Sequence, residues 1–397
     1  MKSKEEFLNE VSAILHNNIL NYWIKNAIDD EFGGFVGRIN GADQIVKGTV
    51  KGAILNARLL WAFSAAYRVS AKSEYLQIAE RAKQYLLTHF YDDKYGGIYW
   101  SVNEDGTPYD TKKQIYAIGF AIYGLSEYVR ATKDLDALEF AIKLYRDVEK
   151  YAFDSVYNGY TEAFTREWLV IDDMRLSQKD ANEKKTMNTH LHIIEPYTNL
   201  YRVWKDVGLR ERLQNLLCIF MDKIYNPQTH HLGLFFSDSW QSRCNIVSFG
   251  HDIEASWLLL ETALTIGDND MQDQVMHISR NLALFAAEGL QPDGSMIYER
   301  FENGETDAER HWWVQAETVV GYLWQAHYYN DTKAYDKAFS CWKYIQTNLI
   351  DTVNGEWWWG VHSDGSKDVE NDKVGFWKCP YHNTRMCLEI IKLLSPL

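Results

Sequence analysis

The segment Tyr95-Gly-Gly-Ile-Tyr-Trp100 is one of six places in this 397-residue chain where a glycine turn is flanked by aromatic or large apolar side chains. A segment of this kind is typical of a β-turn that opens a short hairpin. The six segments start 63, 62, 74, 62 and 61 residues apart, and they are Phe32-Gly-Gly-Phe35, Tyr95-Gly-Gly-Ile-Tyr-Trp100, Tyr157-Asn-Gly-Tyr160, His231-Leu-Gly-Leu-Phe235, Asp293-Gly-Ser-Met-Ile-Tyr298 and Asn354-Gly-Glu-Trp-Trp-Trp359. Such a regular interval predicts a repeat architecture.

Between these turns the apolar residues recur at helical spacing, and each interval has room for two helices. We therefore expect twelve helices, over residues 4–26, 50–71, 73–90, 112–131, 134–151, 186–206, 208–225, 249–266, 270–288, 311–330, 332–349 and 380–394. One helical pair cannot bury its apolar face alone, so the pairs must stack. Closure of the stack gives an all-α (α/α)6 barrel with short aromatic β-hairpins at one mouth and one catalytic domain over residues 1–397. An open superhelix is the alternative.

Composition narrows the class of function. The formal charge of −14 argues against nucleic acid and anionic membranes as partners. Five cysteines without a C-x-x-C pair fit a reduced, cytoplasmic compartment, and neither an apolar leader nor a run of transmembrane length is visible. The 15 Trp and 25 Tyr suit a large core, but their faces also suit sugar rings. We expect a monomer or weak homo-oligomer with a small-molecule substrate.

Every second expected helix carries polar or aromatic residues near its start, on the side that follows a hairpin. In a closed ring these starts meet at one mouth and line one pocket. The residues concerned are Arg58, Tyr116, Phe120, Asn188, His192, Glu195, His251, Glu254, Trp313, Glu317, His382 and Arg385. Any one of them can be structural, as an ion pair or a buried histidine, but three histidines at equivalent helix ends favour a site.

Two of the histidines occupy similar positions in their helices. Ser248 is a plausible N-cap, which places His251 in the first turn, and Glu254 lies on the same face three residues later. A carboxylate beside an imidazole raises its proton affinity and fixes its tautomer. Pro380 suits a first helical position, so His382 also lies in a first turn, where the helix dipole favours the neutral ring.

Several kinds of chemistry remain open on these residues. The pairs His192-Ile-Ile-Glu195 and His251-Asp-Ile-Glu254 could bind a metal ion, because each places a His and a Glu on one face of a helix. Metal sites in helical bundles, however, use the reverse order, Glu-x-x-His. Glycoside hydrolysis needs two carboxyl groups, for which Glu162, Asp172, Asp173 and Asp180 are candidates. A base, an acid and a cation instead fit proton movement beside a carbonyl. A non-catalytic sugar-binding protein is the alternative from another class, and it leaves the histidines unexplained.

Five stretches together resemble the N-acylglucosamine 2-epimerase superfamily, and within it the cellobiose 2-epimerase branch. They are Gly52-Ala-Ile-Leu-Asn-Ala-Arg58-Leu-Leu-Trp61, Lys185-Thr-Met-Asn-Thr-His-Leu-His192, Ser248-Phe-Gly-His-Asp-Ile-Glu-Ala-Ser-Trp257, Trp312-Trp-Val-Gln-Ala-Glu317 and Trp377-Lys-Cys-Pro-Tyr-His-Asn-Thr-Arg-Met386. The resemblance implies an (α/α)6 barrel and epimerisation, without a cofactor, at C2 of the reducing-end sugar of β-1,4-linked disaccharides. The order of the His and Glu residues leads us to expect no metal. N-acylglucosamine epimerisation and aldose–ketose isomerisation are the alternatives within the superfamily.

The resemblance also implies roles for individual residues. It makes His251 and His382 the proton-transfer pair, gives ring opening to His192 and enediolate binding to Arg58, and makes Glu254 the partner of His251. Sugar contacts are implied for the remaining site residues, which are Tyr116, Asn188, Asp180, Trp313 and Trp377, with Phe120 and Glu317 beside them. The chain departs from the family pattern at Ala117-Ile-Gly119, where a polar residue is expected.

Overall fold

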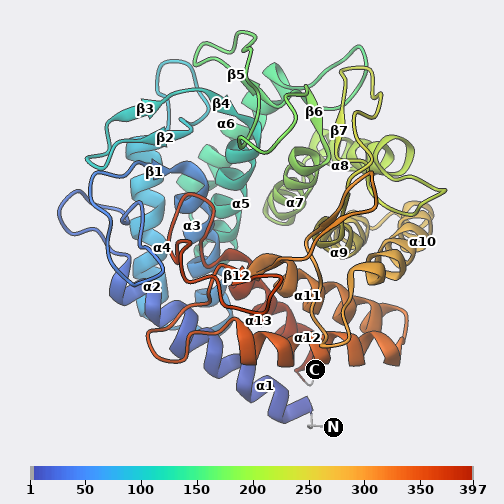
Figure 1. Ribbon diagram of the computed structural model, residues 1–397. Helices are drawn as coiled ribbons and strands as arrows, with labels where there is room; N and C mark the ends of the chain where they lie inside the picture. The colour runs from blue at the N-terminus through green and yellow to red at the C-terminus, as the bar shows by residue number, and fades with distance from the viewer. Residues whose placement is uncertain (1–3, 396–397) are drawn as a thin grey trace.

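The computed structural model describes residues 4–395, which form two concentric rings of helices (Figure 1). The inner ring consists of α3 (Ala53–Ser70), α5 (Ile115–Thr132), α7 (Met187–Val203), α9 (Phe249–Ile266), α11 (Trp312–Tyr328) and α13 (Tyr381–Leu394). Each inner helix contacts the next, and α13 returns to contact α3. The ring is therefore closed, as the (α/α)6 prediction requires, and the open superhelix is wrong.

The outer ring alternates with the inner ring along the chain. It consists of the N-terminal segment α1 (Lys4–Ala13), η1 (Ile14–Leu20) and α2 (Asn21–Asn26), then α4 (Ser73–Tyr85) with η2 (Leu86–Phe90), α6 (Leu135–Tyr151), α8 (Val207–Ile219) with η3 (Phe220–Ile224), α10 (Asn269–Ala286) with η4 (Ala287–Gly289), and α12 (Thr332–Asn348). The twelve expected helices are confirmed, with ends displaced by a few residues. The sequence did not predict that η1, η2 and η3 are π-helical.

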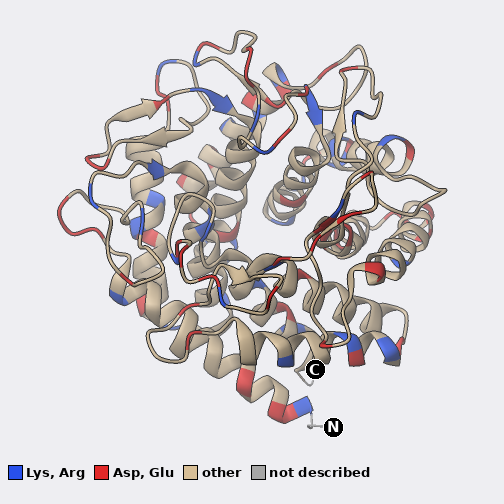
Figure 2. Ribbon diagram, in the orientation of Figure 1, with Lys and Arg blue, Asp and Glu red and all other residues tan. Residues whose placement is uncertain are grey.

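Burial separates the two rings. The first fourteen residues of α3, from Ala53 to Ala66, are all buried, because this helix is enclosed on every side. In α4 the buried residues recur three or four apart, so only one face packs inward. Charged residues of both signs accordingly spread over the outer helices and loops (Figure 2). Among the described residues no helix is long and apolar enough to cross a membrane.

Each of the six predicted turns is closed by an antiparallel bridge, which confirms the repeat. The bridges pair Ile28 with Phe35, Tyr91 with Ile98, Phe153 with Tyr160, Tyr225 with Leu232, Leu290 with Met296, and Ile350 with Trp357. At Asp92 the carboxylate accepts the backbone N–H groups of two turn residues, and buried Lys113 donates to its other oxygen at 2.9 Å. Asp29 with Lys51 and Asp154 with Lys185 repeat this arrangement.

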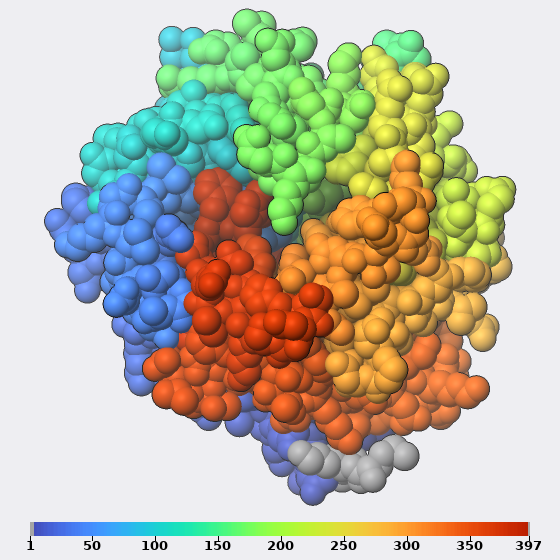
Figure 3. All heavy atoms as spheres, in the orientation of Figure 1, coloured from blue at the N-terminus to red at the C-terminus, as the bar shows by residue number. Residues whose placement is uncertain are grey.

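Short antiparallel strands fix the starts of the inner helices at one mouth of the barrel. The sheets are β1 (Lys51–Gly52) with β2 (Ser101–Val102) and β3 (Pro108–Asp110); β4 (Lys113–Gln114) with β5 (Ala163–Phe164); β6 (Lys185–Thr186) with β7 (Phe235–Phe236); β8 (Val247–Ser248) with β9 (Glu299–Arg300) and β10 (Thr306–Asp307); and β11 (Arg310–His311) with β12 (Gly360–Val361). Strands β1, β4, β6, β8 and β11 each end where an inner helix begins. The first N–H of α3, which lacks a partner within its helix, is bound by the Trp100 carbonyl of the next hairpin. The mouth is hollowed near its centre (Figure 3).

Candidate active site

A cavity of about 310 Å³ lies where the inner helices begin. Ten of the twelve residues to which the family resemblance gives a catalytic or sugar-binding role line it, namely Arg58, Tyr116, Asp180, Asn188, His192, His251, Glu254, Trp313, Trp377 and His382. The other two, Phe120 and Glu317, are buried directly behind this wall and do not line the cavity. The prediction that six helix starts converge on one pocket is therefore confirmed.

Three of the four histidines that line the cavity, His192, His251 and His382, are held through their Nδ1 atoms. His192 Nδ1 lies 2.9 Å from Glu195, and His382 Nδ1 lies 2.7 Å from Glu317. His251 Nδ1 instead lies 2.7 Å from the hydroxyl of Ser248. Among the described residues, none forms a hydrogen bond with Nε2 of any of the three rings. All three Nε2 atoms therefore remain available to a molecule in the cavity.

These partners fix the form of two of the rings. A carboxylate can only accept, so Nδ1 of His192 and of His382 carries the hydrogen, and Nε2 of the neutral ring carries a lone pair. A serine hydroxyl can donate or accept, so His251 is free to adopt either tautomer. Burial lowers the pKa of all three imidazoles, to about 3 for His251 and well below the usual value for His382. The three rings are therefore neutral near pH 7 and can accept protons.

Arg385 lies beneath the cavity and joins the supports of these rings. Its Nη1 donates to Glu195, and its Nη2 donates to Glu254 at 2.5 Å and to Glu317 at 2.6 Å. Tyr381 also donates to Glu195, and Trp257 donates to Glu317 at 3.0 Å. All of these side chains are buried. The carboxylates that orient His192 and His382 are thus fixed by one guanidinium group.

Arg58 provides a positive charge at the wall of the cavity. It donates to the Tyr116 hydroxyl at 2.8 Å, and its guanidinium carbon lies 4.1 Å from the Phe120 ring centre. Among residues 4–395 no carboxylate forms an ion pair with Arg58, and its buried Nε–H has no acceptor. A buried, unpaired guanidinium is suited to an anionic or strongly polar oxygen on a ligand.

A kink in α7 determines the position of His192. Pro196 has no N–H, so the His192 carbonyl lacks its helical partner, and the backbone at His192 leaves the helical region with φ −92° and ψ 15°. Helix α5 approaches this carbonyl closely at Gly119, where an added Cβ would lie 2.3 Å from the oxygen. Only glycine allows this approach, so the unexpected glycine in the Ala117-Ile-Gly119 stretch has a packing role.

The proteins to which this chain is similar agree with this geometry. The sequence profile of the N-acylglucosamine 2-epimerase (GlcNAc 2-epimerase) family matches residues 33–385. The chain belongs to this family. A cellobiose 2-epimerase from Bacteroides fragilis is 55% identical over 383 residues, which cover 96% of this chain and 98% of that protein.

Solved structures agree with the assignment. A cellobiose 2-epimerase from Bacillus thermoamylovorans B4167 superposes with a TM-score of 0.94 at 40% identity, covering 98% of this chain and 99% of that one. A D-mannose isomerase superposes with a TM-score of 0.82 at 18% identity, covering 98% of this chain and 97% of that one, which is a likeness of fold alone. This N-acylglucosamine 2-epimerase family member is therefore an isomerase of the carbohydrate epimerase class.

The structure corrects one expectation about this epimerase-family site. Glu254 is not hydrogen-bonded to His251; its Oε1 accepts from Arg385, and its Oε2 has no partner among the described residues. Ser248 is the N-cap of α9, but its hydroxyl bonds His251 instead of a backbone N–H. Helical spacing placed Glu254 on the right face, but it did not reveal that Arg385 reaches it from α13.

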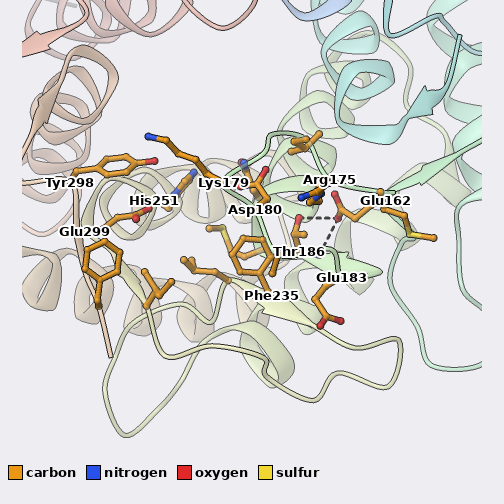
Figure 4. A pocket seen from close by; sticks show the side chains of 18 of the residues that line it. Glu162, Arg175, Lys179, Asp180, Glu183, Thr186, Phe235, His251, Tyr298 and Glu299 are labelled. Carbon is orange, nitrogen blue, oxygen red and sulfur yellow. Dashed lines mark hydrogen bonds between the residues drawn. The ribbon is translucent and has the colours of Figure 1, made fainter. Parts of the chain in front are cut away.

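The carboxyl groups considered for hydrolysis do not form a pair in the cavity. Asp172 and Asp173 are exposed, and Asp173 pairs with Arg175. Glu162 lies in an adjoining cavity of about 380 Å³, where its carboxyl group accepts a hydrogen bond from Thr186 (Figure 4). It also accepts a hydrogen bond from Thr189. Asp180 lines both cavities, although its carboxylate accepts the backbone N–H of Ser177.

Aromatic side chains border the cavity, and some were not predicted. The Trp313 ring lies 4.8 Å from that of His251 and 5.7 Å from that of His382, and Trp377 lies 6.0 Å from Tyr116. The unpredicted lining residues are Leu176, Ser177, Lys179, Tyr298, His311, Trp312 and Trp359. Tyr298 and Trp359 belong to the repeated hairpin segments, so the predicted position of the hairpins at this mouth could have identified them.

Proposed function

We propose that this chain is a cellobiose 2-epimerase that interconverts glucose and mannose at the reducing end of β-1,4-linked disaccharides such as cellobiose, lactose and mannobiose. The proposal includes independence from any cofactor and a catalytic unit that extends over the whole chain. It is supported by three imidazoles that present unoccupied Nε2 atoms to one cavity beside the unpaired Arg58.

Each step of this reaction is a proton transfer, so it depends mainly on groups that accept and donate protons. A sugar in its ring form has no acidic hydrogen at C2, so the ring must first open to the aldehyde. A base then removes the C2 proton, and the electrons move onto the carbonyl oxygen to give a cis-enediolate. An acid returns a proton to C2 on the opposite face, the carbonyl re-forms, and the ring closes. Imidazoles are suited to each proton transfer near neutral pH.

We assign the transfers at C2 to His251 and His382. Both lie in the first turn of an inner helix, and both lie against Trp313, so they face one position in the cavity from two elements. In the reacting complex one ring is neutral and the other is protonated, and the two exchange states with each epimerisation. Removal of the C2 proton charges the first ring and delivery neutralises the second, so the protons balance.

The remaining roles follow from charge and position. Arg58 is assigned to the enediolate oxygen, because its guanidinium group is a buried cation without a carboxylate partner. His192, which is oriented by Glu195, is assigned to proton transfer at the ring oxygen during opening and closing. Trp313, Trp377, Tyr116, Asn188 and Asp180 line the same cavity and are assigned to sugar contacts.

Incubation of the purified chain with cellobiose, followed by NMR, tests the proposal. We expect 4-O-β-glucosyl-mannose to form and to reach equilibrium with cellobiose. A ketose as the main product would indicate an aldose–ketose isomerase of the same family. Turnover of N-acetylglucosamine but not of cellobiose would indicate an N-acylglucosamine 2-epimerase. Saturable binding without any product would indicate a sugar-binding protein.

A further inference from the structure

The group beneath the cavity contains more acidic side chains than its one cation can neutralise. Arg385 contacts Glu195, Glu254 and Glu317, and all four side chains are at most 2% exposed. Three ionised carboxylates and one guanidinium would leave a net charge of −2 among buried side chains. Carboxylates that share a buried site do not all ionise, because each disfavours the charge on its neighbours.

The hydrogen bonds indicate which carboxyl group is protonated. Glu195 accepts from His192, Tyr381 and Arg385, so three donors stabilise its anion. Glu317 likewise accepts from three donors. Glu254 accepts only from Arg385, and its Oε2 atom is buried without a partner among the described residues. The anion is therefore least stabilised at Glu254.

Glu254 lies where a proton on its carboxyl group could form a hydrogen bond with a molecule in the cavity. Glu254 lines the cavity, and one of its oxygens lies within 4.8 Å of ligand atoms of both Glu317 and His382. An ionised Glu254 would repel the negative charge that develops on an enediolate. A neutral carboxyl group in the same place would donate a hydrogen bond, and it needs an acceptor because the protein supplies none.

We propose that the Arg385 group holds one proton, that this proton resides on Glu254, and that the neutral carboxyl group donates a hydrogen bond to a sugar oxygen at the base of the cavity. The hydrogen bond to the sugar rests on the proposed function, whereas the protonation of Glu254 does not. Burial, followed by the nearby Glu317, raises the pKa of Glu254 to about 8, which agrees with a protonated group at neutral pH. The proposal replaces the expectation that Glu254 acts as an anion beside His251.

Infrared spectroscopy of the substrate-free chain tests the proton directly. At pH 7 the difference spectrum between wild type and Glu254→Gln should contain the C=O band of a protonated carboxyl group. Glu356→Gln is the matched control, because Glu356 is also fully buried but accepts from Lys378, Asn383 and Trp23. Its difference spectrum should contain carboxylate bands only. Loss of carboxylate bands alone in Glu254→Gln would overturn the proposal.

Kinetics test the donor role. A glutamine amide can donate the hydrogen bond and can still accept from Arg385, whereas methionine has a similar length but cannot donate. Glu254→Met should therefore lose kcat/KM by at least about tenfold more than Glu254→Gln, with both variants folded by circular dichroism. Equal losses in the two variants would overturn the donor role. If the wild-type chain epimerises no disaccharide, the proposed function fails, but the infrared band still decides whether Glu254 is protonated.

Discussion

The mutation Glu317→Gln tests how much the orientation of His382 contributes to the reaction. Three donors converge on this carboxylate: His382 Nδ1 at 2.7 Å, Arg385 at 2.6 Å and Trp257 at 3.0 Å. An amide offers one acceptor oxygen and adds two hydrogens, so at least one of these donors must face an N–H group. Glutamine has nearly the shape of glutamate, so the change removes charge and acceptors with little effect on packing.

The size of the effect follows from the bonds that are lost. His382 and Arg385 both donate to Oε1 of Glu317, whereas Trp257 donates to Oε2, so the amide oxygen should take the Oε1 position and leave Trp257 without an acceptor. The His382 bond then has a neutral acceptor in place of a charged one, which weakens it by about 1–1.5 kcal/mol and should lower kcat by about 5- to 13-fold. The donor left without an acceptor should lower the free energy of unfolding by about 1–3 kcal/mol. The measurements are kcat for cellobiose under saturating conditions and urea unfolding followed by circular dichroism.

Glu356→Gln provides the matched control for this prediction. Glu356 is equally buried, and a tryptophan, a cation and an amide converge on it, but it does not line the cavity. It should lose a similar free energy of unfolding and lower kcat by no more than a few-fold. The reasoning is refuted if Glu317→Gln keeps its kcat, or if both variants lose activity to the same extent.

Three further results are expected. Trp377→Ala and Trp313→Ala should each weaken disaccharide binding by about 1 kcal/mol or more through lost stacking, measured as KM and by calorimetry, and an unchanged KM in both would exclude them from the site. Gly119→Ala should destabilise the chain by about 1–3 kcal/mol in urea and lower kcat, because its Cβ would displace the His192 carbonyl, whereas Gly208→Ala, an exposed helical control, should do neither. Exhaustive chelation should leave activity intact, because the Arg385 guanidinium group already forms hydrogen bonds with Glu254 and Glu317 where a metal ion would bind. Loss of activity on chelation, with recovery of activity on addition of one divalent ion, would contradict this expectation.

Much of the fold was predictable because the repeat is visible in the sequence. Six turns at nearly constant spacing and two apolar periods per interval predict twelve helices. Closure is favoured over an open superhelix because it brings the polar helix starts together, and the contact between α13 and α3 confirms it. The longest interval, 74 residues, holds the segment between β5 and β6, which carries Asp180 over the cavity. The π-helical segments were not predictable, since the apolar pattern continues through them.

The site was predicted less completely, because part of it depends on contacts between helices. Residues near helix starts could be assigned to one mouth, and eight of them line the cavity. Arg385 was visible in the sequence but received no role, because its three carboxylate partners come from three other helices. For the same reason Glu254 was paired with its neighbour on α9, His251, and not with Arg385. Spacing along one helix indicates a shared face, but it cannot indicate which other helix supplies the partner.

Epimerisation in D2O tests the two-histidine mechanism most directly. If His251 and His382 remove and return the C2 proton, the epimerised product should carry deuterium at C2 of the reducing-end sugar, as measured by NMR and mass spectrometry. His251→Asn and His382→Asn should each lower epimerisation by about 10²–10⁴-fold. A folded variant of either kind could still exchange the C2 hydrogen of one epimer without inverting it. A product without solvent deuterium, or near-normal epimerisation by both variants, would contradict the mechanism.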